Sequence, residues 1–170
     1  MTVADGYWAR RKKYAYYRAL RRHIEALGPA GSILDVGCAD TPVVSWGEYE
    51  RRYTCDLRLK PGLYGVTAFI GDFLDYQPPE HPMDVVVCAQ VLEHLPDTVL
   101  HPFAAKLLAT GRHVVASVPY NWPAGTEPDH CQDPIDEARF IEMMGRDPLR
   151  LEVITERLPR MVGLWKGDHA

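Results

Sequence analysis

The stretch SILDVGCAD, residues 32–40, decides the fold of this 170-residue chain. Its first part is a short apolar run that ends at an acid, Asp35, and a glycine, Gly37. This pattern is typical of a buried parallel strand that leads into a loop at the edge of a sheet. Four later segments have the same character: residues 52–57 (RYTCDL), 66–70 (VTAFI), 84–89 (DVVVCA) and 113–118 (HVVASV). We expect all five to be strands of one sheet.

The first 28 residues predict an amphipathic helix. Residues 7–27 contain no glycine or proline, and Tyr17, Leu20, Ile24 and Leu27 recur at helical spacing. Gly28 and Pro29 then end the helix.

Two further helices and a hairpin are expected in the second half. The first helix follows strand 84–89, with its regular part opening at Pro102, and the second is capped by Asp133 and ends at Gly145. Residues 151–155 and 161–165 predict an antiparallel pair. The fold class is therefore α/β: a Rossmann-like, doubly wound, mostly parallel sheet with an antiparallel C-terminal hairpin, in three layers and a single domain, residues 1–170.

The composition of the chain indicates which binding partners and which cellular compartment are expected. A net charge of −4 does not favour a nucleic-acid partner, and no segment reads as a leader or a membrane span. The four cysteines never form C-x-x-C, which favours a reducing cytoplasm and predicts no metal site. Cys38, Cys55 and Cys88 are expected to be small core residues. A homodimer is compatible with the sequence, which does not decide the oligomeric state.

Acids follow three successive predicted strands. Asp35 ends the first, Asp56 ends the second 21 positions later, and Asp72 with Phe73 ends the third. In a doubly wound sheet, ligands bind at this edge, and an acid at this distance reaches ribose hydroxyls. Residues 37–40 (GCAD) lack the dinucleotide glycine pattern, and an acid at position 40 would repel a diphosphate. A cofactor without phosphates, such as S-adenosylmethionine, is preferred.

At this point the chain resembles the class I S-adenosylmethionine-dependent methyltransferases. Residues 36–42 (VGCADTP) are similar to the family's first motif in its G-C-G-x-x-P variant, and residues 89–96 (AQVLEHLP) to the segment after strand four. Residues 118–123 (VPYNWP) are similar to the fifth-strand exit in a branch often found among glycan and natural-product assembly enzymes. The resemblance implies that the cofactor is bound by Asp35, Gly37, Cys38, Ala39, Asp56, Leu57, Asp72, Phe73, Ala89 and Gln90.

The implied reaction moves a methyl group from S-adenosylmethionine to an oxygen or nitrogen of a small molecule, such as a sugar or a natural-product intermediate. Tyr120, Asn121, Trp122 and His130 are the acceptor-side candidates. His94 or His130 is the candidate base, because a histidine is a suitable base near neutral pH. A loop histidine is also often merely solvated. One alternative is a non-catalytic cofactor-binding or degenerate module, favoured by Ala39 at the family's second glycine. The other is a nicotinamide-dependent reductase, which the missing glycine pattern disfavours.

Overall fold

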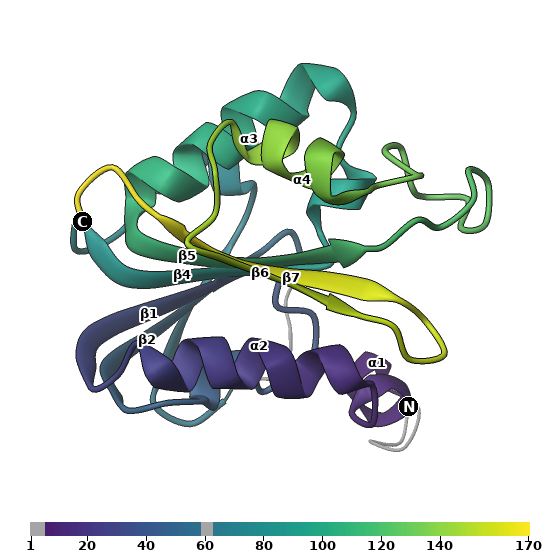
Figure 1. Cartoon of the computed structure of the whole chain (residues 1–170). Helices are drawn as coiled ribbons and strands as arrows, with labels where there is room; N and C mark the ends of the chain where they lie inside the picture. Colours follow the sequence, from purple (N-terminus) through teal and green to yellow (C-terminus); the bar gives the residue numbers. More distant parts are fainter. Residues whose placement is uncertain (1–5, 59–62) are drawn as a thin grey trace.

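The computed structural model describes residues 6–58 and 63–170 (Figure 1). In these ranges the strands are β1 (Ala30–Val36), β2 (Tyr49–Asp56), β3 (Val66–Ile70), β4 (Met83–Ala89), β5 (Gly111–Pro119), β6 (Arg150–Ile154) and β7 (Arg160–Lys166). The α-helices are α1 (Tyr7–Arg11), α2 (Ala15–Ala26), α3 (Asp97–Thr110) and α4 (Glu137–Met144). Three short 3-10 helices are η2 (Val43–Ser45), η3 (Phe73–Asp75) and η4 (Leu92–His94).

The strands form one mixed sheet in the order β3-β2-β1-β4-β5-β7-β6. Strands β1 to β5 pair with one another in parallel, and β7 pairs antiparallel with both β5 and β6. Figure 1 shows α1 and α2 on one face and α3 and α4 on the other. The predicted fold class is thus confirmed. The strand order reverses between β1 and β4, which places a ligand site at their carboxyl ends.

Two apolar cores lie on the two faces of the sheet. In β4, Val85 and Val87 pack on the α2 side, whereas Val86 and Cys88 pack on the α3 side. Neighbouring side chains of a strand point to opposite faces, so a strand covered on both faces reads as a continuous apolar run. The buried positions of Cys38, Cys55 and Cys88 confirm their assignment as core residues.

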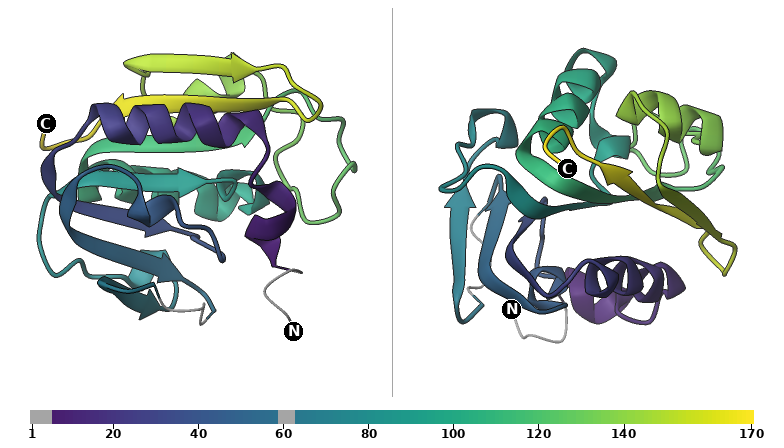
Figure 2. Two further views of the ribbon diagram at one scale, coloured as in Figure 1. Left: turned by 90° about the horizontal axis from the view of Figure 1, so that it is seen from below. Right: turned by 60° about the vertical axis from the view of Figure 1, so that its left-hand side comes forward.

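The N-terminal segment is two helices rather than the single predicted one. Helix α1 ends at Arg11 and α2 begins at Ala15, with Tyr14 extended between them. The backbone N–H of Trp8 donates to Asp40 Oδ1 at 2.7 Å, and the Trp8 ring packs edge-on against Tyr17 at 4.8 Å. These contacts hold α1 against the loop after β1, away from the axis of α2 (Figure 2).

Both predicted starts of the later helices are wrong. Helix α3 begins at Asp97, and Pro102 lies inside it on an exposed side, where the carbonyl of Thr98 can reach water. Helix α4 begins at Glu137, because the side chain of Asp136 accepts the cap hydrogen bond from Arg139 N at 2.7 Å. The predicted cap, Asp133, contacts His130 instead.

The described residues contain no helix that is long and apolar enough to cross a membrane. Between β1 and β2 the crossover contains only η2 and no α-helix. The carboxyl ends of β1 and β4 are therefore left open on the α2 side.

Candidate functional site

A cavity of about 250 Å³ lies at the carboxyl ends of β1 and β4. Its lining includes Asp35, Gly37, Ala39, Gln90, His94 and His130. The structure thus brings together residues from the first loop, the segment after β4 and the long loop after β5. Tyr7 and Arg11 of α1 also line this cavity.

Three non-glycine residues at this edge have a left-handed backbone. The φ angles are 46° for Ala39, 58° for Gln90 and 52° for Asn121. They follow β1, β4 and β5 respectively, and such conformations cluster at ligand sites.

Asp35 and Glu93 are the two buried acids in the described lining of the cavity, and Asp35 lies at the end of β1. Asp35 is 1% exposed. Within the described part of the chain, its Oδ2 atom has no hydrogen-bond partner. Burial raises the pKa of this carboxyl to about 8, and the charge of Asp56 adds to the rise. The protein therefore presents an acceptor group that a ligand can satisfy.

Asp56, the last residue of β2, forms hydrogen bonds that connect β2 to the loop after β1. Its Oδ2 atom accepts from the backbone N–H of Ala39 at 3.0 Å, and its Oδ1 atom accepts from Arg58 N at 3.0 Å. The Cys38 thiol lies 3.8 Å from the same Oδ2 atom. Leu57, the next predicted cofactor residue, is 72% exposed.

Asp72 and Phe73 lie apart from the described lining of the cavity. Asp72 caps η3 by accepting from Leu74 N at 2.9 Å. The Phe73 ring is buried in the core, 5.0 Å from the ring of Phe103 and below the ammonium of Lys106. The Phe73 ring is thus covered by core residues, which differs from its predicted role in binding the cofactor.

Gln90 links β4 to a buried arginine that the sequence reading missed. The Arg160 Nε–H donates to Gln90 Oε1, and the Gln90 amide donates to Ser117 Oγ at 3.3 Å. The Arg160 guanidinium lies 4.1 Å from the centre of the Trp122 ring, and burial lowers the pKa of Arg160. Arg160 opens β7, and no local sequence signal distinguishes it from a surface arginine.

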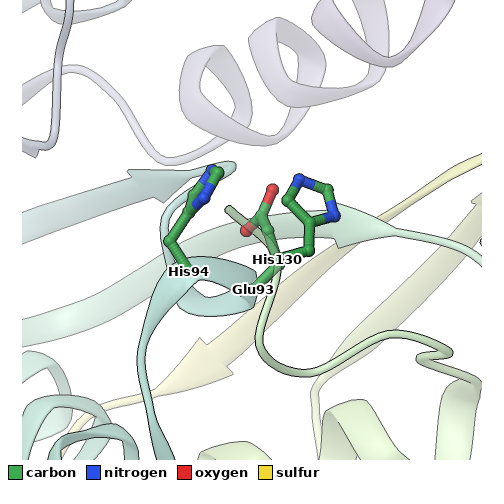
Figure 3. Close-up of side chains that lie close together, drawn as sticks. All are labelled: Glu93, His94 and His130. Atoms are coloured by element: carbon green, nitrogen blue, oxygen red, sulfur yellow. The ribbon is translucent and has the colours of Figure 1, made fainter. Parts of the chain in front are cut away.

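Glu93, His94 and His130 form a cluster at the edge of the cavity. Figure 3 shows the Glu93 carboxylate between the two imidazole rings, with Glu93 and His94 on η4 and His130 on the loop after β5. One side-chain ligand atom from each residue lies within 4.8 Å of the other two. Both histidines were predicted at this cleft, and both line it.

Each histidine of the cluster is oriented through its Nδ1 atom. His130 Nδ1 lies 2.6 Å from Asp133 Oδ2, and His94 Nδ1 lies 3.0 Å from the carbonyl of Asp129. A carbonyl can only accept, so His94 donates from Nδ1 and its Nε2 carries the lone pair. Burial lowers the pKa of His94 and raises that of Glu93 to about 8.

Tyr120, another acceptor-side candidate, points to α4 instead. Its hydroxyl donates to Glu137 Oε1 at 3.3 Å, and it does not belong to the described cavity lining. Trp122, which was also predicted on the acceptor side, does line the cavity, and its ring lies 5.8 Å from the His130 ring at an interplanar angle of 23°.

No family model and no curated protein sequence matches the chain. Solved structures do match. The N-methyltransferase NodS from Bradyrhizobium japonicum, with bound S-adenosylhomocysteine, is 14% identical, with a TM-score of 0.74 over 96% of this chain and 89% of its own. The 1,6-didemethyltoxoflavin-N1-methyltransferase from Burkholderia thailandensis is 16% identical, with a TM-score of 0.73 over 92% and 80%.

The fold is the class I methyltransferase fold. At 14% and 16% identity the likeness establishes the fold and not the substrate. The small RNA methyltransferase HEN1 shares this fold at a TM-score of 0.69, with 94% of this chain and 26% of that one covered. The absence of a nucleic-acid partner, a cytoplasmic location and a homodimer accordingly stay predictions.

Proposed function

We propose that this chain binds S-adenosylmethionine in the cavity at the ends of β1 and β4 and methylates an oxygen or nitrogen of a small molecule. The observation that carries the proposal is the buried, unpartnered Asp35 carboxyl at the strand-order reversal of a class I methyltransferase fold, within the described residues. The cofactor supplies a methyl group already activated on a positively charged sulfur. The protein's task is then to align the acceptor with it.

The charges at the site fit such a cofactor. The carboxyl group of Asp35 lines the cavity, and the carboxylate of Asp56 accepts a hydrogen bond from the first loop. Their oxygens suit an ammonium group and ribose hydroxyls. The loop is also tightly placed, since a Cβ on Gly37 would meet Val91 Cγ2 at 2.4 Å. The carboxylates of Asp40 and Asp56 would repel a diphosphate, so the same site disfavours a dinucleotide.

An acceptor would lie beyond the cluster, on the α1 side. A second hollow of about 330 Å³ shares Arg11, Trp122, Glu127 and Arg160 with the first cavity. An aromatic ring framed by cationic and acidic groups favours a flat or sugar-like polar molecule. His94 and His130 line the first cavity and remain the candidates for contact with the acceptor, whereas the Tyr120 hydroxyl contacts Glu137 of α4.

Calorimetric titration with S-adenosylhomocysteine tests the proposal. We expect the parent protein to bind it and Asp56→Ala to bind at least about tenfold more weakly, because each lost hydrogen bond to a charged acceptor is worth about 1.5 to 3 kcal/mol. Glu50→Ala is the matched control, since Glu50 is an exposed acid of the same strand β2. No binding by the parent protein, or equal affinity in Asp56→Ala, would overturn the assignment.

A further inference from the structure

We propose that Glu93, His94 and His130 bind one divalent transition-metal ion, whose remaining coordination positions take a hydroxyl oxygen of the methyl acceptor. The ion site itself does not depend on the proposed function. The role toward the acceptor rests on the proposed function.

The ligand set fits such an ion. Two imidazoles and one carboxylate are typical ligands of Zn²⁺, Fe²⁺ and related ions, whereas Mg²⁺ and Ca²⁺ prefer oxygen. Ligand atoms bound to Zn²⁺ at about 2.0 to 2.1 Å lie at most about 4.2 Å apart. The three atoms already lie within 4.8 Å, so the cluster can close on an ion by small side-chain rotations.

Glu93 supplies an independent observation. Its side chain is 1% exposed, and its Oε2 atom has no hydrogen-bond partner within the described residues. Burying a carboxyl group without a partner is costly, and a cation in contact with it removes that cost. The backbone fixes the residue there, because the Glu93 carbonyl accepts from Cys131 N at 2.7 Å.

The outer contacts of the two histidines also point to a metal. A ligating histidine characteristically donates its other ring N–H to a carboxylate or a backbone carbonyl, which fixes the tautomer and the ring. His130 has the carboxylate of Asp133, which is 2% exposed, and His94 has the carbonyl of Asp129. Both Nε2 atoms are thereby left for the ion. Asp133 is a positioning residue in this arrangement.

Three protein ligands leave positions open toward the cavity. An acceptor hydroxyl bound there has a lowered pKa and loses its proton to solvent. An oxygen lone pair then forms the new C–O bond while the C–S bond of the sulfonium breaks, and that electron pair returns to sulfur. Within the proposed function this favours oxygen over nitrogen, because a neutral amine already carries a reactive lone pair.

Equilibrium dialysis of chelator-treated protein against Co²⁺ tests the ion site. We expect one Co²⁺ per chain with a visible absorption band. His94→Asn, at an exposed ring, and the isosteric Glu93→Gln should each weaken binding at least tenfold. The controls His101→Asn, on an exposed helix position, and Cys131→Ser, beside the cluster, should bind like the parent protein. No bound Co²⁺, equal binding in the cluster variants, or loss in Cys131→Ser would overturn the site.

Asp133→Asn tests the positioning role. Removal of such an outer contact costs about 10- to 100-fold in metal affinity. We expect that loss together with a changed Co²⁺ absorption band, which a merely structural role would not produce. An unchanged affinity and band would remove Asp133 from the site.

Two further titrations separate the ion from the proposed function. Acetohydroxamate, an oxygen chelator, should change the Co²⁺ band of the loaded protein, and an unchanged band would overturn the open positions. S-adenosylhomocysteine is titrated into the metal-free protein. Its binding without any Co²⁺ binding overturns only the ion. Co²⁺ binding without S-adenosylhomocysteine binding overturns the proposed function and the acceptor role, and supports the ion site.

Discussion

Ala39, Gln90 and Asn121 hold left-handed backbone conformations at the ends of three neighbouring strands. Such a conformation in a non-glycine residue costs on the order of 1 to 3 kcal/mol and persists where surrounding contacts enforce it. The Ala39 N–H bonds Asp56, and the Gln90 side chain bonds Ser117 and Arg160. The contacts that shape the cavity therefore also hold Ala39 and Gln90 in their strained backbone conformations.

We expect Ala39→Gly to leave the free energy of unfolding unchanged or to raise it by up to about 1.5 kcal/mol. A left-handed alanine costs roughly 1 to 2 kcal/mol, which outweighs the entropy of about 0.5 to 1 kcal/mol that glycine loses on folding. Its φ of 46° thus reverses the small loss that the residue type alone predicts. Affinity for S-adenosylhomocysteine should be equal or higher.

Urea denaturation measures this effect, with Ala19→Gly in the buried face of α2 as the control. The control should lose about 1 kcal/mol or more. Equal losses in the two variants would contradict the strain argument. If neither the parent protein nor the Ala39→Gly variant binds S-adenosylhomocysteine, the degenerate, non-catalytic alternative is favoured.

Asp35 should make the fold less stable at alkaline pH. Its folded pKa of about 8 lies above the ordinary value of 3.8, so the folded state holds the proton more tightly than the unfolded state. The stabilising contribution is fully present below the unfolded pKa and is lost as pH rises through the folded pKa. The free energy of unfolding should fall between these two values.

Asp35→Asn removes the titrating group, so the difference in stability between parent and variant should change over this window. Urea midpoints at about pH 5 and about pH 9 measure it. Asp75→Asn, at an exposed position, is the control and should keep the pH slope of the parent protein. A parent-like slope in Asp35→Asn would show that Asp35 titrates normally.

Sequence reasoning placed several residues at the cavity correctly because strand ends are visible in sequence. Asp35, Ala39 and Gln90 follow apolar runs, and parallel strands end at one edge. Arg160 was missed because its burial depends on how the hairpin packs against β5, which no local pattern shows. The direction of the Tyr120 side chain was equally invisible, since it depends on where α4 lies.

At the scale of elements, the sequence predicts that the helices exist but not the residues at which they begin and end. Helices end where tertiary contacts compete with the local pattern. The break after Arg11 follows from the contact between Trp8 and Asp40, 32 positions apart in sequence. The start of α4 moves to Glu137 because Asp133 is occupied by His130.

Helix α2 should contribute to stability through one face only. Leu20 is fully buried against the sheet, so Leu20→Ala is expected to lower the free energy of unfolding by about 2 to 5 kcal/mol. Arg21→Ala, at an exposed neighbour that forms an ion pair with Glu25 of the same helix, should change it by less than about 0.5 kcal/mol. Urea denaturation compares the two, and similar losses would contradict the assigned face.

At the scale of the whole molecule, the site exists because the chain reverses direction across the sheet. After β3 the chain returns to the other side of β1 and lays down β4, so the ends of β1 and β4 diverge. Apolar runs predict strands but not their order in the sheet, which depends on how the crossovers pack. The long loop after β5 then closes the cavity, which brings His130 to Glu93 across 37 positions of sequence.

S-adenosylhomocysteine should stabilise the whole fold against heat. A ligand that binds only the native state adds about 2.7 kcal/mol at 100 times its dissociation constant. One kcal/mol shifts the melting temperature of a 150- to 250-residue domain by about 2 to 4 °C, so the expected rise is about 5 to 11 °C. NADPH at the same concentration is the control, because its phosphates would meet Asp40 and Asp56 near the first loop. Differential scanning calorimetry decides between them: a rise with NADPH and none with S-adenosylhomocysteine would favour the reductase alternative.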